Sequence, residues 1–561
     1  MLRDICKDLK ELFQNKFYCI LLLIIGICTY GFVITHFSIG IDDTAIPMYF
    51  EEGLAPYVGR WTLYMINKVV PITKLSPFLV EAVSMLLMLI SASLWCVLWK
   101  RIISNVIEVP WWIYVLVAGI FVTCPLISEV YVFYLHNGIC IGYGLTALGL
   151  LFFMKSLEKG QNTKALIKYS VFAGLFLFVA LGCYESLMIV FAMGAVLAFI
   201  LLRCFCDIKG TDVHYDTAFV KWIAAGLIAV VTSLIGRTII LKLLNVVNDW
   251  SAFDNLNVTQ RGLLSGIFIP MEELVMNIKR FIMLYYVNAV CYLPITVLVC
   301  AFVVLGIVTI IYSIKKKDWL IFGAFIALPI LPVCLTILEG YTTRYRTCQY
   351  VPLVCSFAIL FVFIMVLKNG RKWLLSVCGV LCGLLVVVQC MDMNQWFYID
   401  YQKYQHAKSV MTGVAVDLQE LENYEKPIIF TGGYPVPAEI TEKAYVSFHS
   451  KKYRLIYLLT DWFDPHLREK YYSITNSGYA FAEMPYMSTL QWGLTAFDGT
   501  SNQLIEFLKM HGYSFNGETD LAKYNEAIEL RQSLAMPCYP EDGYILECQD
   551  YIIVNLSNYF D

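Results

Sequence analysis

The chain has 561 residues, of which 59% are hydrophobic and only 15% are charged, with a formal net charge of -3. Soluble domains carry about 25% charged residues, so this composition, with a mean hydropathy of +0.65, excludes an ordinary soluble protein and predicts a polytopic membrane protein. The small net charge says nothing about partners, because the distribution of charge matters more than its sum. No basic aromatic patch suggests nucleic acid as a partner, whereas a lipid bilayer is a required one.

The first apolar run, residues 17–37, predicts a transmembrane helix. About 20 apolar residues are enough to cross a bilayer as a helix. The segment before the run is long and mixed in charge, and no small-residue cleavage site ends the run. We therefore expect a membrane anchor here rather than a cleavable signal.

Two adjacent carboxylates, Asp42 and Asp43, follow this helix directly. They cannot enter hydrocarbon, and side by side they repel each other, so this position is costly if they have no function. Gly40 and Pro47 predict a tight turn around the pair. A solvated loop or a helix N-cap is the alternative interpretation. We favour a catalytic role for at least one of the two acids.

The loop after the first helix also contains Arg60, within the sequence Gly59-Arg60-Trp61, which could pair with one of these carboxylates. Apolar residues recur at helical spacing in 57–70, and again in 271–286. Both segments predict helices that lie in the outer membrane interface, with ordinary connectors as the alternative.

Ten further apolar runs predict eleven crossings in all. Their approximate cores are 78–99, 110–127, 138–154, 167–183, 186–202, 222–243, 291–314, 319–337, 349–367 and 373–390. Lys and Arg occupy every second connecting loop, beginning with the N-terminal segment. Because cytoplasmic loops carry an excess of these residues, we expect a cytoplasmic N-terminus and an extracytoplasmic tail.

Two short loops on the predicted outer side carry polar side chains that suit a substrate site. Tyr184 and Glu185 stand between two apolar runs, where a carboxylate must reach the surface or a polar cavity; a plain turn is the alternative. Arg344 and Arg346 are two residues apart in a segment expected to be extended, so they point the same way. A planar guanidinium suits phosphate, and we favour phosphate binding over snorkelling to lipid headgroups.

The composition changes after Cys390, which predicts two domains: 1–390 in the membrane and 391–561 as an extracytoplasmic α/β domain. Helical patterns occur at 403–422, 501–511 and 519–535, and strand patterns at 427–431, 543–546 and 551–555. Cys538 and Cys548 could form a disulfide if this domain is exported, and the sequence leaves that bond open.

Other mechanisms find little support in the sequence. Neither a P-loop pattern nor a G-x-S-x-G pattern occurs, which excludes the common ATPase and hydrolase signatures. Charged residues are almost absent from the middles of the apolar runs. Ion-coupled transporters usually need them there, so transport is the less favoured class.

The chain resembles a known family in Asp42-Asp43, in Gly59-Arg60-Trp61 and in Tyr184-Glu185, with looser support from residues 394–401 and 426–433. These features are similar to those of the bacterial integral-membrane glucosyltransferases of the Gtr type II family, within the GT-C superfamily. The resemblance implies an all-α polytopic fold of the GT-C type. It also implies a polyprenyl-phosphate-linked sugar as donor, with glucose favoured, and an acceptor glycan at the outer face of the membrane.

The resemblance maps the family's first-loop acid onto Asp42 or Asp43. We expect an inverting glycosyltransferase in a bacterial plasma membrane, in which one acid is the base and the other orients it or helps to hold a divalent cation. Roles in binding the donor phosphate and the substrate are our own inference for Arg60, Tyr184, Glu185, Arg344 and Arg346. The alternative is a flippase or exporter of lipid-linked glycans, which would need a polar path across the membrane.

Overall fold

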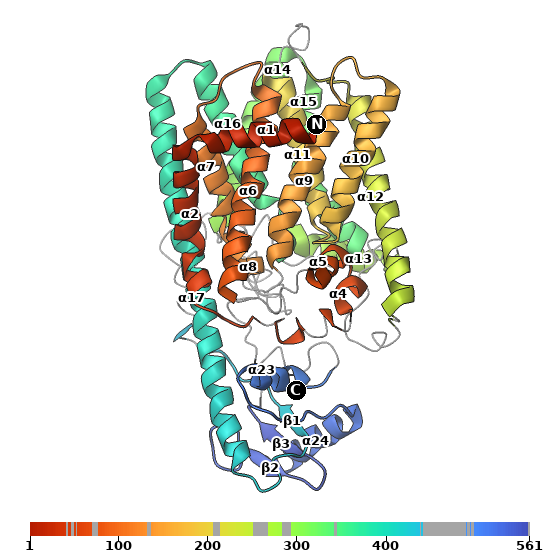
Figure 1. Ribbon diagram of the computed structural model, residues 1–561, viewed down its shortest axis with the longest axis vertical. Coiled ribbons are helices and arrows are strands. Elements are labelled where there is room, and N and C mark those ends of the chain that lie inside the picture. The colour runs from red at the N-terminus through yellow and green to blue at the C-terminus, as the bar shows by residue number, and fades with distance from the viewer. Residues whose placement is uncertain are drawn as a thin grey trace.

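The computed structural model describes residues 1–40, 43–46, 50–51, 53–69, 77–131, 136–205, 214–248, 250, 268–282, 293–340, 345–437, 439–440, 490, 494 and 499–558. The molecule is elongated, with a bundle of long helices at one end and a small α/β domain at the other (Figure 1). One unbroken helix, α17 (Lys372–Gln419), runs from the bundle into the small domain.

Ten helices of the described part are long and apolar enough to cross a membrane. Besides α17 they are α2 (Lys16–Thr35), α6 (Pro77–Ile103), α9 (His136–Ser156), α10 (Thr163–Leu181), α11 (Leu187–Phe205), α12 (Phe219–Asn248), α14 (Leu293–Lys316), α15 (Trp319–Glu339) and α16 (Val351–Lys368). An eleventh candidate consists of two helical pieces joined by a bend of 41°. The first piece is α7 (Trp111–Val122), and the second is formed by η3 (Pro125–Ile127) and α8 (Ser128–Tyr131). The predicted polytopic all-α architecture is therefore confirmed.

Polar residues between the apolar runs set the helix boundaries. Asn15 caps α2, where its Oδ1 accepts hydrogen bonds from the N–H groups of Phe17 and Tyr18. Asn162 caps α10 in the same way. Such side chains satisfy donors that the first turn of a helix leaves without a partner. The bend after α7 coincides with Pro125, which lacks the N–H that a continuing helix would need.

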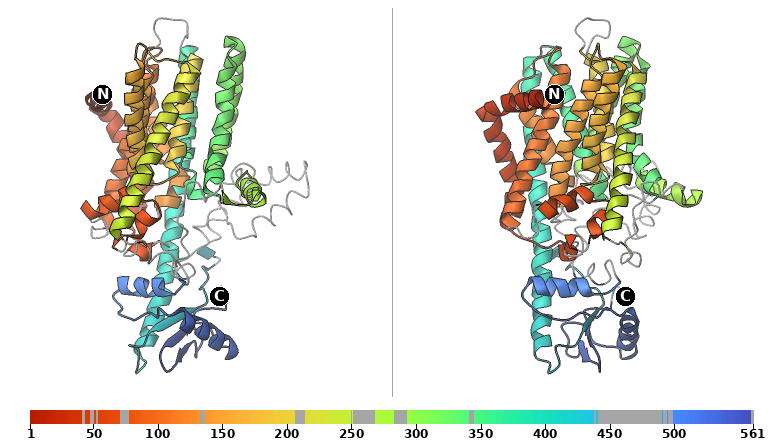
Figure 2. Two further views of the ribbon diagram at one scale, coloured as in Figure 1. Left: turned by 90° about the vertical axis from the view of Figure 1, so that its right-hand side faces the viewer. Right: turned by 45° about the vertical axis from the view of Figure 1, so that its right-hand side comes forward.

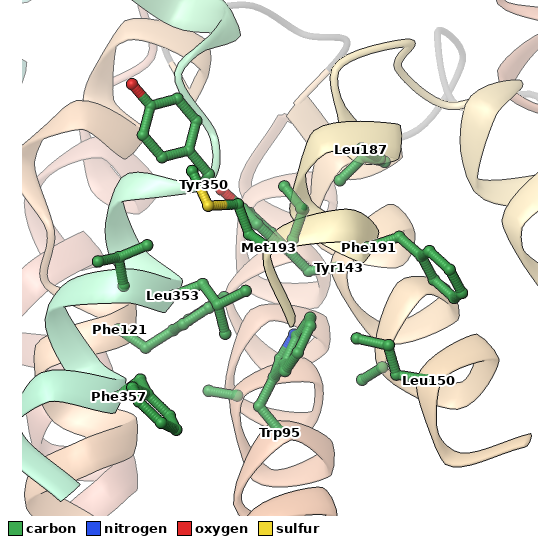
Figure 3. Packing of buried hydrophobic residues seen from close by; sticks show 14 of the residues in the cluster. Trp95, Phe121, Tyr143, Leu150, Leu187, Phe191, Met193, Tyr350, Leu353 and Phe357 are labelled. Atoms are coloured by element: carbon green, nitrogen blue, oxygen red, sulfur yellow. The ribbon is translucent and has the colours of Figure 1, made fainter. Parts of the chain in front are cut away.

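The core of the bundle is filled by large apolar side chains from α6, α7, α9, α11 and α16. Trp95 and Tyr143 lie among Phe121, Leu353 and Phe357 at its centre (Figure 3). Leu150, Leu187, Phe191, Met193 and Tyr350 also belong to this cluster. On one flank, α10 packs between α9 and α12, so α12 lies at the edge of the bundle. Close packing of this kind holds transmembrane helices together, because lipid tails are as apolar as the side chains and provide no hydrophobic driving force for association.

The two ends of the bundle carry different short helices. At the end away from the small domain, α1 (Leu2–Gln14) lies across the bundle, and Lys100 Nζ of α6 donates to Glu11 Oε1 at 2.9 Å (Figure 1). At the other end lie α4 (Leu54–Tyr57), α5 (Trp61–Val69), α8 and α13 (Met271–Ile282). The two predicted interfacial segments are helical over 61–69 and 271–282, and both helices leave large apolar side chains exposed: Met65 and Val69 in α5, and Met271 and Met276 in α13.

The small domain contains a three-stranded sheet in the order β1-β3-β2. The strands are β1 (Ile428–Thr431), β2 (Ile545–Glu547) and β3 (Ile552–Asn555); β3 pairs parallel with β1 and antiparallel with β2. The domain also contains α23 (Asn502–Met510) and α24 (Leu521–Ser533). All three predicted strands are present. Cys538 and Cys548 are free thiols. The predicted domain boundary after residue 390 falls inside α17 and remains a prediction.

Candidate active site

The first loop holds one of the two predicted acids in a closed turn. Asp43 begins η1 (Asp43–Ala45) and is only 2% exposed. Gly40 N–H donates to Asp43 Oδ2 at 2.7 Å, and Asp43 N–H donates to Gly40 O at 3.2 Å. These two bonds fix the direction of the carboxylate. Asp42 and Pro47 lie outside the described residues.

This loop lies where the bundle meets the C-terminal domain. Ile39 is buried in the core of that domain, together with Tyr404 of α17 and Phe507 of α23. The short helix η1 packs against α23. The loop with the predicted catalytic acids is therefore in contact with both parts of the molecule.

A second group of side chains forms where residues 59–61 meet residues 182–185. Gly59 has a φ of +87°, and a Cβ added to it would lie 2.8 Å from Glu185 Oε1. The guanidinium carbon of Arg60 lies 5.2 Å from the centroid of the Tyr184 ring, which is a cation–π distance. Two segments far apart in the sequence, each singled out by its residue types, thus form one cluster.

The N-terminus of α5 is fastened to the turn after α10. The N–H groups of Thr62 and Leu63 donate to Gly182 O at 3.1 and 3.3 Å. Trp61 stacks on Phe178 with the ring centroids 5.5 Å apart. A Cβ on Gly182 would lie 2.5 Å from Trp61 Nε1, so this close approach requires glycine.

Arg237 of α12, which is not among the residues predicted for the site, joins the same cluster. Its Nη2 donates to Glu185 Oε1 at 2.5 Å, and the two side chains are only 12% and 10% exposed. Charged residues were expected to be almost absent from the middles of the apolar runs, and Arg237 is an exception within the run 222–243. The sequence contained a signal for its role, because an arginine within a membrane-spanning run is itself an indicator of function. We call Gly59, Arg60, Tyr184, Glu185 and Arg237 the Glu185 cluster.

The last predicted outer loop is described only in part. Arg344 lies outside the described residues, whereas Arg346 lies in η8 (Tyr345–Thr347), which packs against η3 and α8. Tyr143 OH donates to Gln349 O at 2.8 Å and so fastens the segment after η8 to α9. Arg346 is thus held at the α8 side of this end of the bundle, while the Glu185 cluster is built on the link between α4 and α5, on α12 and on the turn after α10.

The chemistry available here consists of carboxylates and guanidinium groups. A carboxylate can accept a proton, and a planar guanidinium can donate several hydrogen bonds to a phosphate. Groups of three or more His, Cys, Asp or Glu side chains that could hold a metal ion do not occur among the described residues. A cation site that uses Asp42 lies outside those residues, so the divalent cation remains a prediction.

Comparison with known proteins decides the family. A family model described as glucosyl transferase GtrII matches residues 31–363. The chain belongs to the GtrII family. A search of curated proteins and a search of solved structures gave no match.

The GtrII match confirms the resemblance inferred from the sequence and makes the helical bundle one of the GT-C type. The matched residues include the first loop, the Glu185 cluster and η8, and they end before α17. As a GtrII family member the protein is a glycosyltransferase embedded in a membrane. The C-terminal domain lies outside the matched region.

Proposed function

We propose that this GtrII family member transfers a sugar, with glucose favoured, from a polyprenyl-phosphate donor to a glycan or cell-wall polymer. The acceptor lies at the outer face of a bacterial plasma membrane, and the N-terminus lies in the cytoplasm. The observation that carries the proposal is the buried, oriented carboxylate of Asp43, held in a closed turn at the end of the bundle that faces the C-terminal domain.

The proposed reaction is a single displacement. Asp42 or Asp43 accepts the proton of an acceptor hydroxyl while that oxygen forms a bond to the anomeric carbon. The bond between the anomeric carbon and the phosphate oxygen breaks, and polyprenyl phosphate leaves with the electron pair. Because attack and departure take place on opposite faces, the anomeric centre is inverted.

The arginines on this end of the bundle supply the second requirement, stabilisation of charge on the leaving phosphate. Arg60, Arg344 and Arg346 are the candidates, with Tyr184 and Glu185 as further substrate contacts. Arg60 is supported by its place in the Glu185 cluster, where the Tyr184 ring holds its guanidinium. A divalent cation bound through Asp42 and Asp43 would share this task if the reaction requires one.

The test is to change Asp42 and Asp43 separately to Asn and to assay sugar transfer from the lipid-linked donor. Asn keeps an oxygen that can accept from Gly40 N–H, so the turn is retained while the base is lost. We expect the variant of the true base to lose about 10²–10⁴-fold in kcat. Glu51→Gln, an exposed acid of the same loop, is the matched control and should stay fully active.

Full activity in both Asn variants would refute the assignment of the base. The same preparations, reconstituted in vesicles with labelled lipid-linked sugar, also test the flippase alternative. Translocation of the label without transfer to an acceptor would favour that alternative over the enzyme.

A further inference from the structure

A polar contact joins the first loop to the helix that enters the C-terminal domain. Ser38 Oγ, four residues before Asp42, donates to Asp400 Oδ2 at 3.1 Å. The other oxygen of the same carboxylate, Oδ1, lies 3.1 Å from Lys403 Nζ, one turn further along α17. Asp400 therefore contacts the loop with one oxygen and its own helix with the other.

The ion pair is buried, which is unusual for an aspartate and a lysine on neighbouring turns of a helix. The side chains of Asp400 and Lys403 are 10% and 5% exposed. Taking two charges out of water is expensive, and replacement by apolar residues is often neutral or favourable for stability. Its best-attested use is to specify one arrangement of the chain, and here the arrangement specified is that of the first loop on α17.

Packing contacts on both sides of Ser38 hold the same segment. The rings of His36 and Tyr401 pack in a T-shaped arrangement with their centroids 5.3 Å apart. The rings of Phe37 and Tyr404 do the same with their centroids 6.2 Å apart. On the other side, Ile39 enters the core of the C-terminal domain. The hydrogen bond from Ser38 to Asp400 of α17 is thus flanked by packing that leads directly to the closed turn at Asp43.

We propose that Ser38, Asp400 and Lys403 form a polar clamp that positions the catalytic loop, so that α17 and the C-terminal domain control the placement of the acids. The three are positioning residues, since they act through Asp42 and Asp43 and do not touch the substrate. The clamp's effect on transfer rests on the proposed function, whereas its effect on the loop does not.

The first test removes only the hydroxyl, with Ser38→Ala, and keeps it in Ser38→Thr. Hydrogen exchange of the Gly40 and Asp43 amides, measured on the full chain in nanodiscs, reports directly on the turn. A hydrogen bond to a charged group contributes about 1.5–3 kcal/mol, so exchange should accelerate by about 10- to 100-fold in the Ala variant and stay near the parent rate in the Thr variant.

The second test measures kcat and the KM of the lipid donor separately. A misplaced catalytic group lowers kcat by up to about 10²-fold, while the donor KM should change less than about twofold, because the arginines proposed to bind the donor phosphate lie outside residues 36–43. Ser376→Ala is the matched control: its exposed hydroxyl, near the start of α17, donates to Lys372 O of the same helix, so neither exchange nor kcat should change.

Lys403→Met provides an independent variant that removes the ammonium and keeps most of the side-chain volume. It should accelerate exchange at Gly40 and Asp43 as Ser38→Ala does. Faster exchange with reduced kcat supports the clamp. Faster exchange with unchanged kcat supports the clamp but overturns the role of Asp42 and Asp43 under the proposed function. Unchanged exchange in both Ser38→Ala and Lys403→Met overturns the clamp itself.

Discussion

At the scale of single residues, the Glu185 cluster leaves no room for a side chain at position 59. Gly59 combines a left-handed backbone with close approach to Glu185 Oε1, and Glu185 is itself held by Arg237. An added methyl group would therefore have to displace one partner of a buried ion pair. This explains why glycine stands directly before Arg60 and Trp61 in the sequence.

Gly59→Ala should destabilise the protein more than Gly160→Ala does. Both glycines have a positive φ, +87° and +84°, so both variants carry a similar backbone strain of about 1–3 kcal/mol. Only Gly59 has a neighbour within 3 Å of the added Cβ, whereas Gly160 has nothing within 4 Å. Thermal unfolding in nanodiscs measures the difference, which we expect to be about 1–3 kcal/mol. Equal losses in the two variants would contradict the close contact with Glu185.

Arg237→Met should be strongly destabilising, by about 3–5 kcal/mol, because it leaves the Glu185 carboxylate buried without this partner. The double variant Arg237→Met with Glu185→Gln should recover most of the loss, since both charges are then gone. Lys221→Met is the control: its pair with Asp216 is half exposed, and removal of such a pair costs less than about 1 kcal/mol. Thermal unfolding of the four proteins, including the parent, gives the comparison. A double variant no more stable than Arg237→Met would argue against the pair.

At the scale of elements, short segments connect helices that are distant in the sequence. The turn after α10 receives the first N–H groups of α5, and the first loop reaches from α2 to α23. Within the C-terminal domain, the segment between α23 and α24 is fastened to β1, because Ile428 N–H donates to Asn516 O and Glu518 N–H donates to Ile428 O. The first and the last of these junctions use backbone groups that a helix end or a strand edge leaves available.

The junction at Glu518 should depend on pH. Burial alone would raise the pKa of Glu518, but the N–H groups of Asp520 and Thr519 and the ammonium of Lys523 outweigh it and hold the pKa below its usual value. A depressed pKa means that the stabilisation is complete above the unfolded-state pKa and is lost as the pH falls through the folded-state pKa.

We therefore expect the protection of β1 amides, corrected for intrinsic exchange, to fall between about pH 5 and pH 3 in the parent protein. In Glu518→Gln the protection should be lower at neutral pH and should change less over this interval, because no carboxylate remains to be protonated there. A parallel pH profile in the two proteins would show that another group controls the junction.

At the scale of the whole molecule, α1 and the C-terminal domain lie at opposite ends of the bundle (Figures 1 and 2). Among the described residues, ten helices and the bent pair are the candidate crossings. The proposed orientation places Ser104, at the α1 end, in the cytoplasm and Ser533, in the C-terminal domain, outside. Both side chains are exposed, so both positions accept a reactive cysteine without loss of packing.

Ser533→Cys should add labelling by a membrane-impermeant thiol reagent in intact cells, relative to the unsubstituted chain, and Ser104→Cys should add it only after permeabilisation. The physical reason is that Lys and Arg concentrate in the loops on the Ser104 side. The reverse pattern would place the acids of the first loop in the cytoplasm and remove the basis for transfer at the outer face.

Much of this architecture is determined by the sequence alone, because membrane insertion depends on local hydrophobicity over about 20 residues. The eleven apolar runs correspond to the ten helices and the bent pair, and the three strands of the C-terminal domain lie where β-rich segments predict them. The residue types of the Glu185 cluster could likewise be singled out one by one. The amphipathic character of α1 and the arginine at position 237 within a spanning run are also visible in the sequence.

Only the tertiary structure decided which of these residues meet. The contact of Gly59 with Glu185, the pairing of Arg237 with Glu185 and the link from Ser38 to Asp400 each join segments that hydrophobic periodicity treats independently. Such contacts depend on how helices pack and rotate against one another, and that is a property of the assembled bundle. The sequence could name the acids of the first loop, but their attachment to α17 and the C-terminal domain arises from packing across the whole chain.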